Sequence, residues 1–212
     1  MSDSSCQTII KPNASVLDCT AANRCFWIKR ESDKVLWTDI EPELEIPADM
    51  IVDIRNTEFE DGQFNTIIFD PPHWWGDTIG KNVYALRNWK DAEEYNERYG
   101  TNSHVSYYGC DKYITKKSLL GFINRAQREI YRILDDGGVL WFNWSDVKIS
   151  LDKILPFFDS NWDVMIKLPI GSKKQTRSTH QNWWVMMMKN NSSHTTKKPF
   201  PRDEDWEEGI TN

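Results

Sequence analysis

The residues best suited to chemistry in this sequence follow an apolar run that ends at Phe69. They are Asp70, Pro71, Pro72 and His73. Two consecutive prolines fix two backbone φ angles and lack N–H groups, so this corner is stiff and its carbonyl groups can point at a ligand. The Asp70 carboxylate and the Pro71 carbonyl can each accept a hydrogen bond from an amine, which leaves the nitrogen lone pair free to attack an electrophile. These four residues are the candidate catalytic residues, although Asp-Pro-Pro is also common in simple turns.

Aromatic side chains adjoin this corner. We expect His73 to lie against a flat substrate ring, with Trp74 or Trp75 on the second face of that ring. Asn143, in a later apolar run, is expected to line the same pocket. The chain contains 11 tryptophans, and we expect packing in the core and at its rim to account for most of them.

Three further acids, Asp18, Asp39 and Asp53, also stand at the ends of apolar runs. Asp39 lies 21 positions after Asp18, close to the spacing of about 20 at which α/β nucleotide sites place a carboxylate on ribose hydroxyls. Asp53 and Ile54 are placed to meet the edge of an adenine ring. Each acid taken singly could instead be a solvated strand end or a helix cap.

The turn after Asp18 is made of small residues, among them Thr20, Ala21 and Ala22. We expect this turn to open a first helix and to bring backbone close to a cofactor. It lacks the glycines of a dinucleotide-binding loop, because no glycine occurs before Gly62. Two roles are open for Arg24: it binds a carboxylate of the cofactor, or it pairs with a neighbouring acid.

Short apolar runs that alternate with polar or helical stretches predict buried parallel strands. The five runs are 15–18, 34–39, 50–53, 66–70 and 138–143. Apolar residues at helical spacing predict a helix over 117–134 that ends at the turn 135–138, and a second helix over 148–158. The runs 162–167 and 183–188 read as a final antiparallel pair. Together they predict an α/β fold with a seven-stranded sheet whose carboxyl edge carries the acids.

The domain organisation follows from the same pattern. With 212 residues and 39% hydrophobic content, the chain suits one domain over 15–189, preceded by an N-terminal segment 1–14. The polar, aromatic-rich stretch 77–116 is a long insertion of the kind that forms lids and substrate-recognition loops. The polar, acidic tail 190–212 is expected to be disordered.

The net charge of −6 argues against attraction of a polyanion by the whole surface, but it leaves a local basic patch open. Such a patch is Lys173, Lys174 and Arg177 in the loop before the last strand, where they could contact a phosphate backbone. A solvated hairpin tip is the alternative. The four cysteines and four histidines show no metal-ligand or disulfide spacing, so we expect no metal.

No apolar run approaches the roughly 18–20 residues of a membrane span, and the N-terminus lacks the pattern of a secretion signal. The protein is therefore expected to be cytoplasmic, without a membrane partner. We expect a monomer or a weak dimer.

The sequence resembles a known family, the class I methyltransferases whose fourth motif reads Asp or Asn, two prolines, and then Tyr, Phe, Trp or His. The family includes adenine-N6 methyltransferases of DNA and RNA, and the likeness spans Ser15 to about Lys189. The segments Leu17–Trp27, Asp53–Asn56 and Phe69–His73 look more closely like a small methyltransferase group common in phages and prokaryotes. This resemblance implies a Rossmann-like, seven-stranded, mostly parallel sheet with an antiparallel last strand, and S-adenosyl-L-methionine as the cofactor.

Matched by position, Asp18 and its loop would face the methionine part of the cofactor, Asp39 the ribose, and Asp53 or Ile54 the adenine. Asp70 would lie between the cofactor and the acceptor amine. The leading hypothesis is methylation of adenine N6 in DNA, with the base flipped out of the duplex. The alternatives are an RNA base (adenine N6 or guanine N2), a protein glutamine amide, and a binding subunit without activity.

Overall fold

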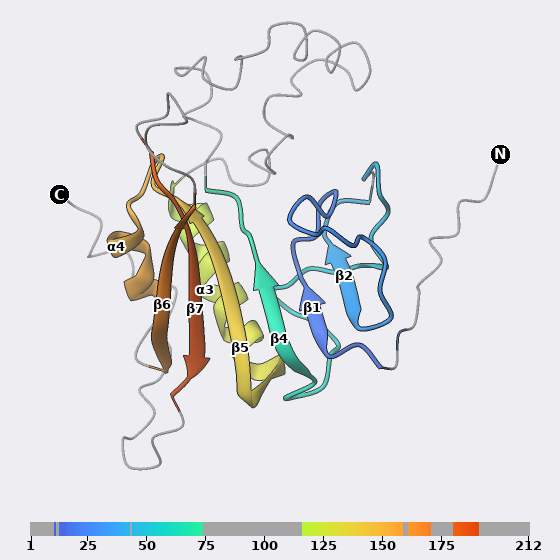
Figure 1. Cartoon of the computed structure of the whole chain (residues 1–212). Helices are drawn as coiled ribbons and strands as arrows, with labels where there is room; N and C mark the ends of the chain where they lie inside the picture. The colour runs from blue at the N-terminus through green and yellow to red at the C-terminus, as the bar shows by residue number, and fades with distance from the viewer. Residues whose placement is uncertain are drawn as a thin grey trace, which may run out of the picture.

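The computed structural model describes residues 11, 13–42, 44–73, 116–158, 161–170 and 180–190. In the described part of the chain the strands and helices follow one another in a simple order (Figure 1). They are β1 (Val16–Asp18), β2 (Val35–Asp39), β3 (Met50–Ile51), β4 (Phe64–Phe69), α3 (Lys116–Ile133), β5 (Leu134–Ser145), α4 (Leu151–Ile154), the 3-10 helix η4 (Leu155–Phe158), β6 (Trp162–Ile170) and β7 (Asn182–Lys189).

The seven strands form one sheet in the order β3-β2-β1-β4-β5-β7-β6. Strands β1 to β5 pair in parallel, whereas β7 runs antiparallel to both β5 and β6. This arrangement confirms the predicted Rossmann-like, seven-stranded, mostly parallel sheet with an antiparallel last strand. The chain moves outward from β1 to β3 and then returns to place β4 on the other side of β1. The topological switch point of the sheet therefore lies between β1 and β4.

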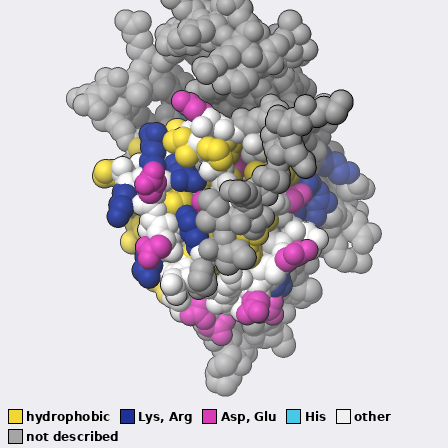
Figure 2. Space-filling view, turned by 90° about the vertical axis from the view of Figure 1, so that its right-hand side faces the viewer, with side chains coloured by type: hydrophobic (Ala, Val, Ile, Leu, Met, Phe, Trp, Pro, Cys, Tyr) yellow, Lys and Arg dark blue, Asp and Glu magenta, His cyan; other side chains and the backbone are white. Residues whose placement is uncertain are grey.

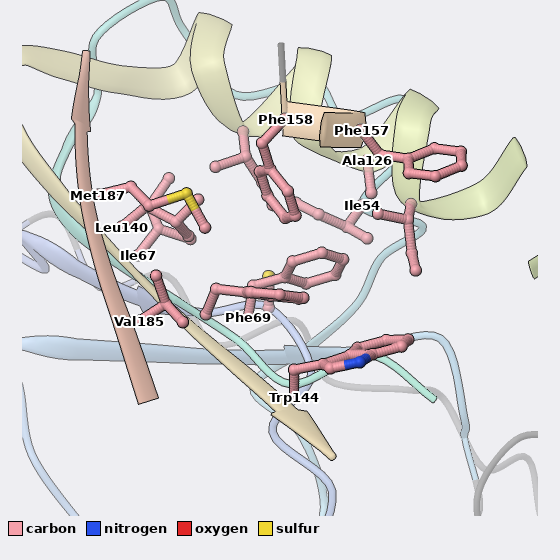
Figure 3. Close-up of a cluster of buried hydrophobic side chains, with 14 of the residues drawn as sticks. Ile54, Ile67, Phe69, Ala126, Leu140, Trp144, Phe157, Phe158, Val185 and Met187 are labelled. Carbon is pink, nitrogen blue, oxygen red and sulfur yellow. The ribbon is translucent and has the colours of Figure 1, made fainter. Parts of the chain in front are cut away.

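The main core lies between the sheet and the helices α3, α4 and η4. Apolar side chains recur along one side of α3 at the spacing that predicts the helix, and they are buried: Leu119, Leu120, Ile123, Ala126, Ile130 and Ile133. Figure 3 shows how the side chains of β4, β5 and β7 meet those of the helices: it labels Ile67, Phe69, Leu140, Trp144, Val185 and Met187 opposite Ala126, Phe157 and Phe158. Burial on this scale is the dominant favourable term in folding.

Two predicted boundaries differ from the structure. Residues 135–138 do not form a separate turn, because β5 begins at Leu134 and the register with β4 shifts before Val139, which makes a bulge. A Cβ at Gly138 would lie 2.7 Å from a Leu134 methyl carbon, so the bulge requires glycine there. The predicted helix over 148–158 is split into α4 and η4, since Pro156 supplies no N–H for a continuous α-helix.

The prediction of a helix after β1 is wrong. Residues 19–34 connect β1 to β2 by turns alone. Ala22 and Arg24 adopt φ angles of 43° and 54°, and such left-handed residues cannot continue a right-handed α-helix. In the described residues before α3 there is no helix, and the described segments that follow β1 and β2 are loops.

Strand β6 forms one edge of the sheet, and its side chains remain exposed after Trp162. Val164, Ile166 and Leu168 are each more than two-fifths exposed, and Pro169 stands near the end of the strand. Among the helices that the structure describes, none combines the length and the apolar character needed to cross a membrane.

Candidate active site

The candidate site lies at the switch point, where two neighbouring parallel strands end. Asp18 is the last residue of β1 and is in register with Ile68 of β4. Asp70 follows the end of β4, so its backbone lies two residues beyond that level. The carboxyl edge at a switch point is where open α/β sheets bind their ligands. The structure thus brings together two of the predicted acids, Asp18 and Asp70, at the expected place.

Asp18 is buried and doubly hydrogen-bonded. The Thr20 backbone N–H donates to Asp18 Oδ1 at 3.3 Å, and the Trp27 indole Nε1–H donates to Oδ2 at 2.7 Å. Burial raises the pKa of Asp18 to about 6, and the hydrogen bonds from Trp27 and Thr20 oppose that rise. The Asp18 carboxylate therefore lies in a low-dielectric environment, where a nearby cation or a bound proton would stabilise it.

Asp70 shares this environment. Burial, with a second contribution from the charge of Asp18, raises the pKa of Asp70 to about 7. Its backbone N–H donates to Thr20 Oγ1 at 2.7 Å. A carboxyl group whose pKa lies near neutrality is suited to accepting and releasing a proton.

His73 is held against the core as a neutral ring. Its ring lies edge-on to the buried Trp144, with ring centroids 6.2 Å apart. Burial lowers the pKa of His73 to about 4, and a hydrogen bond to the backbone of Pro71 opposes the shift. Because proline has no N–H, that bond uses the Pro71 carbonyl, an oxygen with two lone pairs. The His73 ring is therefore uncharged at neutral pH, and it is hydrogen-bonded to the proline corner.

Asp39 and Asp53 both brace loops at the same edge. Asp39 Oδ2 accepts the Ala22 N–H and Oδ1 accepts the Glu41 N–H, each at 2.9 Å. Asp53 binds the backbone and the guanidinium of Arg55, and these bonds lower the pKa of Asp53. A carboxylate has about four lone-pair directions, so the two loop contacts of Asp39 leave capacity for a ligand, whereas Arg55 makes four contacts with Asp53.

Arg24 is paired with an acid, Asp49, and with two backbone carbonyls. Its Nη1 donates to the Arg30 carbonyl at 2.6 Å, and its Nη2 donates to the Pro47 carbonyl at 2.8 Å. The same Nη2 lies 3.5 Å from Asp49 Oδ1, and the guanidinium carbon lies 4.1 Å from the Trp37 ring centroid. The buried guanidinium thus holds two loops and a strand together.

Three other predicted residues present little side-chain surface. Ile54 is 4% exposed and its side chain points into the main core (Figure 3). Ala21 packs in a second cluster with Val35 and Trp37. Asn143 is 6% exposed in β5. Trp74, Trp75, Lys173, Lys174 and Arg177 lie outside the described residues, as do 77–115 of the predicted insertion and 191–212 of the predicted tail.

The role of Trp27 was missed by sequence reasoning. Its indole reaches Asp18, and its ring lies edge-on to Trp37 at a centroid distance of 5.8 Å. The sequence did contain a clue to this role, because Trp27 is the last residue of the segment Leu17–Trp27 that resembles the methyltransferase group. The neighbouring Phe26 was also missed: its ring lies edge-on to Trp184 of β7 at 5.0 Å, so this loop reaches across the sheet.

Charge on the described surface is mixed. Viewed from the side of β2, the molecule shows both acidic and basic side chains with apolar ones between them (Figure 2). This face offers no uniformly basic surface to a polyanion. Across the described ranges, no group of three or more His, Cys, Asp or Glu side chains is gathered as for a metal ion.

Comparisons with known proteins gave matches of structure only. No family model matches the sequence, and no curated protein matches it. The protein PH0226 from Pyrococcus horikoshii has a TM-score of 0.48 at 12% identity, over 82% of this chain and 81% of its own. A candidate type 11 methyltransferase from Sulfolobus solfataricus has a TM-score of 0.46 at 12% identity, over 87% of this chain and 89% of its own. A candidate DNA modification methylase from Thermus thermophilus has a TM-score of 0.37 at 15% identity, over 69% of this chain and 56% of its own.

Proposed function

We propose that this protein transfers a methyl group from S-adenosylmethionine to an exocyclic amino group, and that the acceptor is adenine N6 in DNA. One observation carries the proposal. A stiff double-proline corner presents the Asp70 carboxylate and the Pro71 carbonyl beside the buried Asp18, at the switch point of a Rossmann-like sheet. The corner supplies two oxygen acceptors, which is what a primary amine with two N–H donors requires.

The cofactor suits the charge of this site. The buried Asp18 and the half-buried Asp70 lie close enough for the charge of Asp18 to raise the pKa of Asp70. Within the described residues, no cationic side chain is paired with Asp70. A bound S-adenosylmethionine would supply a sulfonium cation and its electrophilic methyl group. A positive charge here would stabilise both carboxylates in their ionised forms.

The residues that would hold the cofactor follow the strand ends. We assign the methionine part to Asp18, Thr20 and Ala21, and the ribose to Asp39. Because the side chain of Ile54 is packed in the core, Ile54 would meet the adenine through its backbone, next to Asp53. Arg24 would support this loop from behind, since its guanidinium is already bound to protein groups.

The acceptor amine would be held by Asp70 and Pro71. Their oxygens accept its two N–H groups and draw the nitrogen lone pair out of conjugation with the ring, toward the methyl group. After transfer, the surplus proton of the nitrogen passes to the ionised carboxylate of Asp70, whose pKa near 7 suits that step. His73, neutral and fixed against Trp144, flanks the substrate ring.

The choice of adenine in DNA rests on the shape of the acceptor. A flat base with an exocyclic amine fits a corner flanked by aromatic rings, and such a base must leave the duplex to reach the half-buried carboxylate of Asp70. Lys173, Lys174 and Arg177 would contact phosphates, while Trp74, Trp75 and Asn143 would line the base pocket. With a net charge of −6, we expect DNA affinity that is modest and falls with added salt.

The test combines isotope transfer with a paired variant. The purified protein is incubated with methyl-labelled S-adenosylmethionine and DNA, RNA or protein from one host, and the products are analysed by mass spectrometry of nucleosides and peptides. We expect label in N6-methyladenine from DNA. Asp70→Ala is expected to abolish transfer while calorimetry shows cofactor binding largely intact. Asp152→Ala, which removes an exposed acid paired only with Lys167 among the described groups, is the matched control and should keep activity.

Each other outcome has a defined meaning. Label in RNA or in glutamine side chains replaces the acceptor and keeps the chemistry. Failure of the wild-type protein to bind S-adenosylmethionine contradicts the enzyme and leaves a binding subunit. Loss of both binding and transfer in Asp70→Ala would show that Asp70 is structural.

A further inference from the structure

Thr20 joins the two acids of the candidate site. Its backbone N–H donates to Asp18 Oδ1 at 3.3 Å, and its side-chain Oγ1 accepts the Asp70 N–H at 2.7 Å. Asp18 ends β1 and Asp70 follows the end of β4, and Thr20 is hydrogen-bonded to both acids. The hydroxyl bond spans 50 positions of sequence, so it fixes the end of one strand relative to the loop that follows another.

The backbone of the proline corner gives this bond unusual weight. Neither Pro71 nor Pro72 has an N–H, so Asp70 carries the only backbone donor in the three residues 70–72. If a backbone N–H of residues 70–72 is to hold the corner in place by donating a hydrogen bond, that N–H must be the one of Asp70. In the structure this N–H donates to Thr20 Oγ1.

The neighbouring residues hold Thr20 itself in place. Cys19 donates both its backbone N–H and its thiol to the Ile68 carbonyl, each at 3.1 Å. The Ala21 N–H donates to the Thr38 carbonyl of β2 at 3.0 Å. The short segment 19–21 is thus bonded to the strands on both sides of β1. A rigid segment can transmit an accurate position to the group bonded to it.

We infer that Thr20 is a positioning residue for Asp70, in addition to any backbone contact its loop makes with a cofactor. The inference rests on the proposed function, because it concerns where the Asp70 carboxylate and the Pro71 carbonyl stand when they receive the amine. Loss of the Thr20 hydroxyl leaves the Asp70 N–H without its acceptor and frees the corner to shift. The rate of methyl transfer then falls while the cofactor remains bound.

The test uses Thr20→Val, which keeps the shape of the side chain and removes the hydroxyl, and Thr20→Ser, which keeps the hydroxyl. The matched control is Thr57→Val. Thr57 is also half-buried and its hydroxyl donates to Glu129 Oε1 at 2.7 Å, in a separate network with Arg132. We measure kcat, the calorimetric Kd of S-adenosylmethionine, and hydrogen exchange of the Asp70 amide by NMR.

For Thr20→Val we expect kcat to fall about tenfold to a hundredfold, the loss typical of a small misplacement of reacting groups. The Kd of the cofactor should stay unchanged. The Asp70 amide should exchange about tenfold faster, as for the loss of one net hydrogen bond. Thr20→Ser should restore both kcat and the slow exchange, and Thr57→Val should leave both at the wild-type values.

Two results would overturn the inference. One is a raised cofactor Kd with kcat intact in Thr20→Val, which would make the hydroxyl a cofactor ligand instead. The other is unchanged exchange at the Asp70 amide. If Thr20→Val does not fold, Thr20→Ala carries the same expectations. Exchange is measured without substrate, so it tests the hydrogen bond even if the wild-type protein transfers no methyl group, a result that would contradict only the proposed function.

Discussion

The two halves of the sheet are stabilised by different means. In the helix-covered half, made of β4, β5 and β7 with α3, α4 and η4, apolar side chains interlock in one large cluster. In the loop-supported half, made of β1 to β3, Leu17, Leu36 and Ile54 join that cluster, and a second, smaller apolar cluster has Ala21, Val35 and Trp37 as its buried members. Buried polar groups take the place of a helix there, chief among them Asp18, Arg24 and Asp49.

The network around Asp49 shows how loops can replace a helix. Asp49 binds the charged groups of Lys11 and Arg24 and accepts the Trp37 N–H at 3.0 Å. The two cations also lie over the Trp37 ring, at 4.3 and 4.1 Å from its centroid. Such groups are directional, unlike apolar contacts. The half of the sheet that ends in Asp18 and carries the loop at residues 19–21 is therefore held in large part by directional bonds.

The largest expected effect is in Arg24→Met, which would break this network. The substitution removes one of the two cationic partners of the buried Asp49. We therefore expect a loss of about 3 kcal/mol in the free energy of unfolding. Ile123→Val in the helix-covered half should cost only about 1 kcal/mol. Urea denaturation of both variants measures the difference. Equal losses would mean that the loop-supported half does not depend on its charges.

A smaller effect of opposite sign is expected for Asp70→Asn. The pKa of Asp70 is raised from 3.8 to about 7, so the folded protein keeps a proton that the unfolded chain releases. The stability contributed by this group is therefore full below about pH 4 and is lost as the pH rises toward 7. Asparagine does not ionise, so the variant should be more stable at about pH 8, by on the order of 2 kcal/mol, with the gain shrinking toward pH 4.

Thermal unfolding of wild type and Asp70→Asn at several pH values checks this sign. A gain in Tm that is independent of pH would argue that ionisation of Asp70 carries no cost in the fold. The same titration predicts that methyl transfer by the wild-type protein rises with pH through about 7, because the ionised carboxylate is the acceptor.

The smallest expected effect is in Trp27→Phe, which sharpens the comparison by removing one directional bond and keeping an aromatic ring. The Trp27 N–H lowers the pKa of Asp18, so its loss should raise that pKa above about 6. More of Asp18 is then protonated near pH 6, and S-adenosylmethionine should bind several-fold more weakly there than at pH 8. Calorimetry at both pH values measures this, and an equal loss at both would assign Trp27 a packing role.

The helix-covered half was the easier to predict from the sequence. Its apolar runs and the spacing of Leu119, Ile123 and Ile130 are the direct pattern of buried strands and an amphipathic helix. The positions of Asp18 and Asp70 also followed from the sequence, because strand ends in a parallel sheet share one edge.

The loop-supported half was harder to predict for physical reasons. The left-handed conformations of Ala22 and Arg24 carry no local signal, since neither residue type favours positive φ. The partners of Arg24 are distant in sequence, as Pro47 and Asp49 lie more than 20 positions away. Only tertiary contacts determine such a loop, so a pattern of apolar residues cannot reveal it.

The exposed edge at β6 has a consequence for how this chain meets other chains. A free strand edge rich in Val, Ile and Leu side chains is a template on which further strands can add. Pro169 interrupts this template, because a proline in an edge strand turns its missing N–H away from the sheet. An approaching strand would lack a donor at that point, which discourages sheet growth between molecules and protects the protein from aggregation along this side.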